Sequence, residues 1–334
     1  NLSFGNQFVS AALESNTDNA RYTQLEFSSD GGIGVSDNGW VYSNAHGEAA
    51  SGTVTVRSKT TPSSASSIEV AVTADAVQRQ RFADAEVERV ILSKKIGNKG
   101  NVIGEDDFRE LTDISYWFSN NKAITSFNEL CNIKSAKMMG AFQSCSALES
   151  VCLDGVTIVD HIDSMFFNCG SLNSVDFSNA KCTTNTHLYR TFESCYALER
   201  VNFRGFDATK IQHFQRTFYG CSGLKYVDLG DLDTSNFVSN YGLDGVFNNC
   251  RKIESLKLGA PFFNAYKKYS LSTTVFKDLD SWINDDEIAD MLSCLPDLTS
   301  LNISRTLYFS ANTFAHITQT QIKEALANGW TITK

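Results

Sequence analysis

Positive charge is scarce in this chain, and the scarcity limits the partners that the protein can bind. The 334 residues hold 29 Lys and Arg against 38 Asp and Glu, which gives a formal net charge of -9 at pH 7. Proteins bind nucleic-acid backbones mainly through Lys and Arg side chains. The charge balance therefore argues against a nucleic acid as the partner.

Long apolar runs and catalytic motifs are also missing. No run approaches the roughly 20 apolar residues of a membrane-spanning helix, and the sequence has no G-x-S-x-G, H-E-x-x-H or phosphate-loop motif. We therefore expect no transmembrane segment, no enzymatic activity and no cofactor. No signal peptide is visible and the chain starts at Asn1, so we expect a processed or trimmed chain, and a lipid anchor would lie in the removed segment.

Cysteine is absent from the N-terminal part of the chain, whereas nine cysteines occur from Cys131 onward. Five of them occupy one position of a repeated pattern, F-x-x-C-x-x-L-x-x-V-x-L, which is clearest over residues 142–153. They are Cys145, Cys169, Cys195, Cys221 and Cys250, at steps of 24 to 29 residues. Self-similarity at such a period is typical of a solenoid, in which each unit stacks on the next.

The pattern also predicts how one unit is built. The segment L-x-x-V-x-L is a short strand whose apolar residues face inward, and stacking aligns the strands into a parallel sheet over one core. A cysteine that repeats in phase with Leu and Val is a small buried hydrophobe, so we expect free thiols in this column. Cys131, Cys152, Cys182 and Cys294 lie outside it, and the sequence leaves open whether they form disulfides.

The repeat resembles the leucine-rich repeats of BspA-type bacterial surface proteins. Residues 165–178 read M-F-F-N-C-G-S-L-N-S-V-D-F-S, close to that family's M-F-x-x-C-x-x-L-x-x-L-D-L-S, and residues 229–236 are similar to its L-S-x-F-D-T-S-N segment. The resemblance covers about residues 85–334. It implies an α/β solenoid shaped as a horseshoe, with a parallel sheet on the concave face. It also implies a surface or secreted protein without catalytic residues.

Less regular copies flank the five clear ones. Residues 87–92 match the strand half of the repeat without its cysteine half, and residues 118–127 form a fuller copy with Asn121 at the cysteine position. Residues 259–285 break the period. Residues 292–303 restore it as an atypical closing repeat, as expected of a solenoid cap.

Capping signals predict two helices near the C-terminal end. Asn284 is followed by Glu287, and Thr318 by Gln321, at the spacing of helix N-terminal caps. Gly329 is expected to end the second helix. The following residues, 330–333, fit a last strand.

The segment that precedes residue 77 differs in character from the rest. Alternation of apolar and polar residues, with turn signals between, predicts strands at residues 22–27, 40–42, 52–57 and 67–73 and turns at residues 37–39 and 61–64. Several short strands at close spacing favour a β-sandwich.

The order of these segments resembles the group-two bacterial immunoglobulin-like domains over about residues 2–75. The matching segments are residues 25–30, 35–41, 47–49 and 52–56. We therefore expect an immunoglobulin-like β-sandwich at residues 1–76, and a solenoid with N- and C-terminal capping segments at residues 77–334. The alternative is a generic β cap that shields the end of the solenoid.

Side chains that flank the inward Val of each strand should form three columns on the open face of the sheet. The first column is Ser150, Ser174, Arg200, Tyr226, Ser255 and Ser300; the second is Cys152, Asp176, Asn202, Asp228, Lys257 and Asn302; the third is Asp154, Ser178, Arg204, Gly230, Gly259 and Ser304. Arg and Tyr are favoured contact residues in protein interfaces. The candidate partner-binding residues are Arg200, Arg204, Tyr226, Asp176, Asn202, Asp228 and Lys257. The alternative is an ordinary solvated sheet face.

Three of the five histidines share one phase of the repeat. His161, His187 and His213 each stand eight residues before a column cysteine, so we expect them to stack. Such a column could share a metal ion or titrate together. Because tetrahedral metal sites need converging rather than parallel ligands, we favour polar residues that bond a turn and expect no metal.

These observations lead to one functional expectation with two alternatives. We expect a non-catalytic bacterial recognition or adhesion protein, extracellular or on the cell surface, that binds a protein partner through the concave face. The partner would be a host, matrix or other bacterial surface protein, and the chain itself a monomer. A glycan-binding surface module and a structural spacer are the alternatives.

Overall fold

The structure, a computed structural model, divides the chain into two compact units. One comprises Asn1–Arg81 with Gly97–Asp107, and the other Phe82–Ile96 with Phe108–Lys334. A division at residue 76 stays a prediction. The structure describes residues 2–5, 8–11, 25–35, 41–43, 50–58, 65–72, 82–94, 104–203, 205–207, 209–230 and 232–334.

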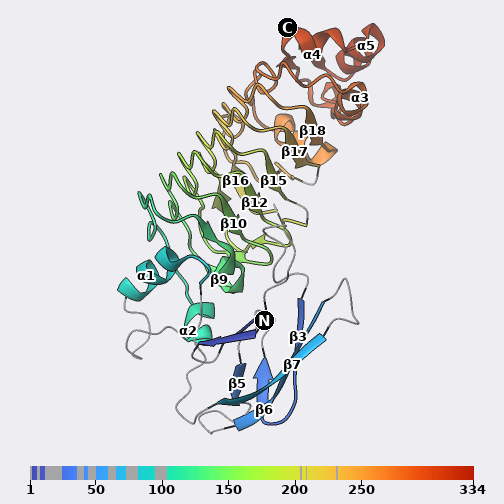
Figure 1. The fold of residues 1–334 in the computed structure, drawn as a ribbon. Coiled ribbons are helices and arrows are strands. Elements are labelled where there is room, and N and C mark those ends of the chain that lie inside the picture. The colour runs from blue at the N-terminus through green and yellow to red at the C-terminus, as the bar shows by residue number, and fades with distance from the viewer. Residues whose placement is uncertain are drawn as a thin grey trace. The chain divides into compact units, whose positions relative to one another are not determined.

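The first unit is built from antiparallel strands (Figure 1). Its described strands are β1 (Leu2–Gly5), β2 (Phe8–Ala11), β3 (Leu25–Ser29), β4 (Ile33–Val35), β5 (Val41–Ser43), β6 (Ala50–Ser58) and β7 (Ala65–Val72). They form a three-stranded sheet in the order β3-β6-β7 and the pairs β1-β2 and β4-β5. These strands confirm the four that the sequence predicts, whereas both expected turns lie outside the described residues. An immunoglobulin-like sandwich stays a prediction.

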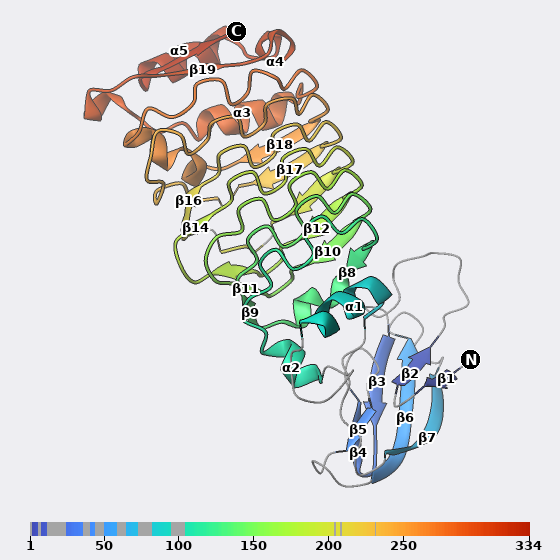
Figure 2. The same cartoon turned by 90° about the vertical axis from the view of Figure 1, so that its left-hand side faces the viewer.

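The second unit is a solenoid whose coils stack along a six-stranded sheet (Figures 1 and 2). All the strand pairs of this sheet are parallel. Its strands, in chain order, are β8 (Ser126–Phe127), β10 (Ser150–Cys152), β12 (Ser174–Asp176), β15 (Arg200–Asn202), β17 (Tyr226–Leu229) and β18 (Ser255–Leu258). The predicted leucine-rich-repeat architecture with its parallel sheet is confirmed.

Two further parallel ladders join some of the neighbouring coils. One joins β9 (Ser135–Ala136), β11 (Thr157–Ile158) and β13 (Lys181–Cys182), and the other joins β14 (Thr186–His187) to β16 (Ile211–His213). Each coil has two turn residues with a left-handed backbone, at φ between 55° and 73°. The first stands five positions before the residue at the cysteine site, and this set is Tyr116, Gly140, Ser164, Arg190, Arg216 and Gly245. The second stands one position before that residue, and this set is Asn120, Ser144, Asn168, Ser194, Gly220 and Asn249.

The core of the solenoid is made of stacked columns. Each column cysteine is buried, and its thiol donates a hydrogen bond to the main-chain oxygen of the Phe one coil earlier. Cys195, for example, donates to Phe166 at 3.0 Å. The rings of successive column Phe residues stack face to face at 5.2 to 5.8 Å between centroids. Burial raises the pKa of Cys145 to about 12. The expectation of free thiols in this column is confirmed.

Residues 87–92 do not form the strand that their match to the repeat predicts. They lie in helix α1 (Ala85–Ser93), whose N-cap is Asp84. The sequence V-x-x-V-I-L also fits a helix, since it places Val87, Val90 and Ile91 on one face, and all three are buried. Without a cysteine half, nothing in this segment closes a coil. The prediction of a strand here is wrong.

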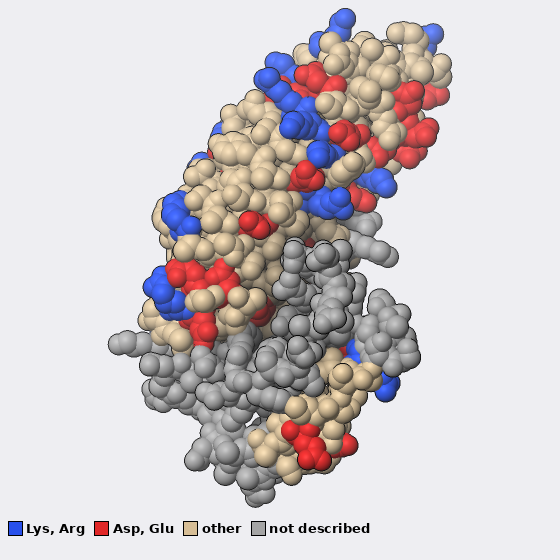
Figure 3. Space-filling model, in the orientation of Figure 1, with Lys and Arg blue, Asp and Glu red and all other residues tan. Residues whose placement is uncertain are grey.

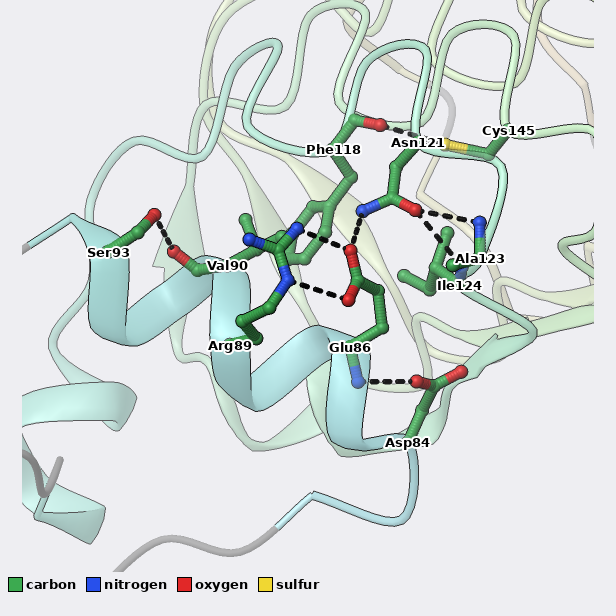
Figure 4. Close-up of polar contacts among 10 residues, drawn as sticks. All are labelled: Asp84, Glu86, Arg89, Val90, Ser93, Phe118, Asn121, Ala123, Ile124 and Cys145. Atoms are coloured by element: carbon green, nitrogen blue, oxygen red, sulfur yellow. Dashed lines mark hydrogen bonds and ion pairs between the residues drawn. The ribbon is translucent and has the colours of Figure 1, made fainter.

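Helix α1 meets the first complete coil at Asn121 (Figure 4). The Asn121 side-chain oxygen accepts hydrogen bonds from the amides of Ala123 at 2.9 Å and Ile124 at 3.1 Å. Its nitrogen donates to Glu86 Oε1 of α1 at 2.6 Å. Asn121 therefore occupies the cysteine position, as predicted, and joins this coil to the helix.

The C-terminal end contains more helix than strand. The last elements are η2 (Ala260–Lys267), α3 (Asp285–Ser293), η3 (Thr299–Leu301), β19 (Arg305–Tyr308), α4 (Ala311–Ala315), α5 (Gln319–Ala327) and β20 (Trp330–Thr333). The helix caps at Asn284 and Thr318 are confirmed. The remaining short elements are α2 (Glu105–Arg109) and η1 (Asn128–Asn132).

The prediction of a closing strand within residues 292–303 is wrong. Residues 299–301 form η3, Asn302 has φ +54°, and the strand that follows, β19, pairs with β20 instead. A physical reason lies at the free edge of β18. Glu287 of α3 accepts hydrogen bonds there from the Ser255 hydroxyl at 2.5 Å and the Leu256 amide at 2.9 Å. This carboxylate occupies the Leu256 amide, a main-chain donor that another strand would use.

Candidate functional site

The outer face of the six-stranded sheet carries the first two of the three columns predicted from the repeat. In the observed register Arg200 lies between Ser174 and Tyr226, and Tyr226 lies next to Ser255. The inward residue of each strand is buried, so its two neighbours point outward. The first column begins one strand earlier than predicted, at Ser126 beside Ser150. The described members of the third column, Asp154, Ser178, Gly230 and Gly259, lie just past the ends of the strands. Ser300, Asn302 and Ser304 lie outside the sheet altogether.

The neighbouring strands β15 and β17 carry an aromatic ring paired with a guanidinium group on this face. The Arg200 guanidinium carbon lies 5.7 Å from the centre of the Tyr226 ring, and the Tyr226 hydroxyl donates to Glu254 at 3.4 Å. Tyr226 is 44% exposed. Beside it, the Lys225 ammonium lies 2.9 Å from a Glu199 carboxylate oxygen. We name Arg200, Tyr226 and Glu254 the tyrosine cluster.

Sequence reasoning missed Glu199 and Glu254. A signal was present, since the residue just before each strand is polar in every clear copy: Glu149, Asn173, Glu199, Lys225 and Glu254. Figure 3 shows that side chains of both signs gather toward the β17 and β18 end of the solenoid. The charges are therefore mixed and do not form a field of one sign.

Two of the predicted site residues are occupied with holding a turn. Asp176 Oδ1 accepts hydrogen bonds from the Ser178 amide at 2.9 Å, the Ser178 hydroxyl at 2.6 Å and the Asn202 side-chain nitrogen at 3.0 Å. The Asn202 nitrogen also donates to the Ser178 hydroxyl at 2.7 Å. Asp176 and Asn202 therefore stabilise the exit from their strands and present a fixed polar surface.

The other predicted site residues lie toward the β18 edge. Asp228 accepts a hydrogen bond from the Gly230 amide at 3.1 Å and is the register partner of Lys257. Both side chains are exposed. Arg204 lies outside the described residues. The structure thus brings Arg200, Tyr226, Asp228 and Lys257 onto one face.

The three histidines form the column that the sequence predicts. The His161 and His187 rings stack at 3.8 Å between centroids, and the His187 and His213 rings meet edge to face at 4.5 Å. His161 Nδ1 accepts a hydrogen bond from the His187 amide at 3.2 Å. Within the described parts of the chain, no group of three or more His, Cys, Asp and Glu could hold a metal ion. The column is a stack that bonds the backbone of the neighbouring coil.

Two carboxylates accompany this stack, and neither was singled out from the sequence. Asp160 lies 3.6 Å from His161 Nε2, and Asp163 lies 3.9 Å from His187 Nδ1. Burial, followed by the charge of neighbouring histidine, lowers the pKa of His187 and of His213. Burial raises the pKa of Asp163. Both effects favour the neutral forms of these groups.

A second cluster, which the sequence did not reveal, lies on the turns of the coils. The nearly buried Glu193 carboxylate bonds the guanidinium groups of Arg190 (2.9 and 3.2 Å) and Arg216 (2.8 and 2.7 Å). Both arginines have left-handed backbones, where Gly140 and Gly245 stand in other coils. A left-handed backbone costs a residue other than glycine roughly 1–2 kcal/mol. The two ion pairs help to offset that cost.

Comparison with known families identifies the repeat. The family described as BspA type Leucine rich repeat region matches in six copies, over residues 109–225, 139–276 and 189–321. Together these ranges span more than half of the 334 residues. No curated protein matches the chain. In the residues that the structure describes, no helix has the length and apolarity needed to cross a membrane.

Proposed function

The chain belongs to the BspA type leucine-rich-repeat family, and on this premise we propose that it is a non-catalytic recognition or adhesion protein. Repeats of this type are typically surface or adhesion modules, and leucine-rich-repeat domains generally mediate protein interactions. In this proposal the protein acts outside the cell or on a bacterial cell surface, with lipid anchoring as one mode of attachment. The outer face of the six-stranded sheet binds a host, matrix or bacterial surface protein.

The observation that carries this proposal is the tyrosine cluster. Tyr226 is a large, exposed side chain on β17, the strand next to the edge strand β18, and Arg200 lies against its ring. Tyr and Arg are enriched among the residues that dominate protein interfaces. The contact between them and the bond to Glu254 restrict the Tyr226 side chain before any partner arrives. Preorganisation of this kind lowers the entropy cost of binding.

The same cluster favours a protein over a glycan as the partner. An aromatic ring that binds a sugar offers it an open face, but Tyr226 is already paired with the Arg200 guanidinium. Side chains of both charge signs lie beside the ring, as in the pair Lys225 and Glu199. Mixed charges suit a protein surface of complementary pattern. The first unit, proposed as an immunoglobulin-like module, would act as a spacer.

The test combines a binding screen with matched variants. The whole chain would be screened against host matrix proteins, bacterial surface proteins and a glycan array. Any ligand found would be titrated against Arg200→Ala, Tyr226→Ala and the control Tyr241→Ala. Tyr241 is 63% exposed but lies outside the strands of the sheet. Because truncating a central anchor costs about 2 kcal/mol or more, we expect each sheet variant to weaken binding at least about thirtyfold.

Other outcomes separate the alternatives. Binding to glycans alone, abolished by Tyr226→Ala, would replace the protein partner with a sugar. Affinity for a protein that survives both sheet variants but falls in Tyr241→Ala would move the site to the turns. If no ligand were found in any class, a structural spacer would be the better description.

A further inference from the structure

Four cysteines lie outside the buried column, and they differ in their access to solvent. Cys182 is buried, whereas Cys131, Cys152 and Cys294 are half-exposed. The five column thiols are fully buried, and each donates a hydrogen bond to a Phe main-chain oxygen. Burial also raises their pKa values, as it does for Cys145. Thiols in such surroundings are unreactive, so any thiol chemistry belongs to the half-exposed three.

Two of these three lie together at the first strands of the sheet. Cys152 is the last residue of β10, and it faces outward because the buried Val151 precedes it. Cys131 belongs to η1, which packs against β10. The Cys131 thiol donates to the main-chain oxygen of Asn128 at 3.1 Å. The Cys131 and Cys152 side chains also lie close enough to interact with each other.

The two sulfurs are unequal. The Cys131 thiol donates its proton to the Asn128 main-chain oxygen, which favours the thiol form of Cys131. The interaction with Cys131 lowers the pKa of Cys152. Since the thiolate is the nucleophile in thiol–disulfide exchange, Cys152 is suited to attack first. Cys131, held beside it as a thiol, is suited to attack second.

We propose that Cys131 and Cys152 form a reversible disulfide by exchange with a small-molecule disulfide. In the first step the Cys152 thiolate attacks one sulfur of the reagent, which forms a mixed disulfide at Cys152 and releases one thiolate. In the second step Cys131 loses its proton to solvent, and its sulfur attacks the Cys152 sulfur. The protein disulfide forms and a second thiolate leaves. Two protein thiols are oxidised, and one reagent disulfide is reduced to two thiols.

The surrounding charges select the reagent. Glu129 and Asp154 act electrostatically on Cys131, and Asp154 and Asp176 act on Cys152. An anionic disulfide is therefore repelled and a cationic one is attracted. We expect cystamine to react faster than oxidised glutathione at low salt, with the difference shrinking as salt is added.

The location connects this chemistry with the outer face of the sheet. Cys152 and Asp176 are register partners, and the next strand after β12 carries Arg200. A Cys131–Cys152 disulfide would tie η1 to this face. The first strands of the face would then differ between the oxidised and the reduced protein.

The test uses the whole chain and needs no substitution at first. The reduced protein would be incubated with cystamine at about pH 8, near the usual thiol pKa, then quenched with acid, alkylated in denaturant and mapped by peptide mass. We expect a Cys131–Cys152 linkage, two fewer alkylated cysteines than the nine of the reduced chain, and a return to nine after a reductant. Modification of Cys294 at the same rate as Cys152, or a mixed disulfide that persists at Cys152, would overturn the proposal.

Three variants assign the two roles. Cys131→Ser should retain the cysteamine adduct on Cys152, because the second attack is lost. Cys152→Ser should leave Cys131 unmodified under the same conditions, and the control Cys294→Ser should behave as the wild type. Circular dichroism would show that each variant is folded. An adduct on Cys131 in Cys152→Ser at the wild-type rate would contradict the assigned order of attack.

Discussion

Replacing Asn121 with Cys would restore the consensus of the repeat, and yet we expect it to destabilise the solenoid. In later coils the thiol donates to a Phe oxygen one coil earlier, as Cys145 does to Phe118 at 3.0 Å. Asn121 lies in the first complete coil, where helix α1 takes the place of a preceding coil (Figure 4). The partners of Asn121 are two amides and a carboxylate, and a thiol cannot replace its side chain in all three bonds.

The magnitude follows from the bonds that would be lost. Asn121 accepts from two main-chain amides, at 2.9 and 3.1 Å, and donates to Glu86 at 2.6 Å. Each such bond contributes about 1 kcal/mol net. Their loss should therefore cost about 2–3 kcal/mol, which is about a 30- to 150-fold increase in local opening.

Hydrogen exchange measured by mass spectrometry would report this opening. Exchange at the amides of α1 and of residues 118–127 should accelerate by that factor in Asn121→Cys. Glu86→Ala is the matched variant, since it keeps Asn121 with both of its amide bonds and removes the carboxylate that accepts from the Asn121 nitrogen. It should show a smaller acceleration. Unchanged or slower exchange in Asn121→Cys would refute the reasoning that position 121 is fixed by its cap rather than by the repeat.

Three further predictions concern charged groups. As the pH falls below about 6.5, the second unit should lose stability, because His187 and His213 have lowered pKa values in the folded state and the unfolded chain therefore binds protons first. Nearer pH 3.8, the raised pKa of Asp163 should increase stability as the pH falls, because there the folded state binds the proton first. Thermal unfolding across pH should show a smaller loss in His187→Gln than in the wild type, and an equal loss would contradict the assignment. Glu193→Gln should lower the free energy of unfolding, measured by urea denaturation, by about 2 kcal/mol, because the two part-exposed guanidinium groups lose the carboxylate charge that they share. A change within about 0.5 kcal/mol, typical of surface sites, would show that the cluster does not stabilise the fold. Glu287→Ala should leave the edge of β18 unprotected and cause concentration-dependent association, measured by light scattering. The control Asp286→Ala should behave as the wild type. Equal behaviour of the two variants would show that Glu287 does not protect the edge.

The repeat allowed much of the solenoid to be predicted, because residues in phase must stack. The cysteine column, the Phe and Val columns and the histidine stack all follow from counting residues. The register of Ser174, Arg200 and Tyr226 on one face follows in the same way. Position along the repeat is therefore enough to place side chains that recur in it.

The ends of the solenoid were harder to predict, because the pattern there is ambiguous. The segment with Val87 and Val90 fits a strand and a helix equally, and only the Asp84 cap and the missing cysteine half favour the helix. At the other end, the sequence identified Glu287 as part of a helix cap. Its bond to the Leu256 amide, which ends the sheet, depends on how α3 packs and leaves no mark in the spacing.

Contacts between unequal positions of neighbouring coils were also outside the reach of sequence reasoning. Cys131 and Cys152 share no phase of the repeat, so counting could not bring them together. The same holds for Arg216, which reaches Glu193 from the next coil. Such pairs depend on side-chain direction, which the spacing of residues along the chain does not determine.

The claim that the outer face of the sheet binds a protein is tested most directly by photocrosslinking. A photoreactive phenylalanine analogue would replace Tyr226 in one sample and Tyr241 in another, and each would be irradiated with a partner from the binding screen. The account predicts a covalent adduct from position 226 and none from position 241. An adduct from position 241 alone would contradict it.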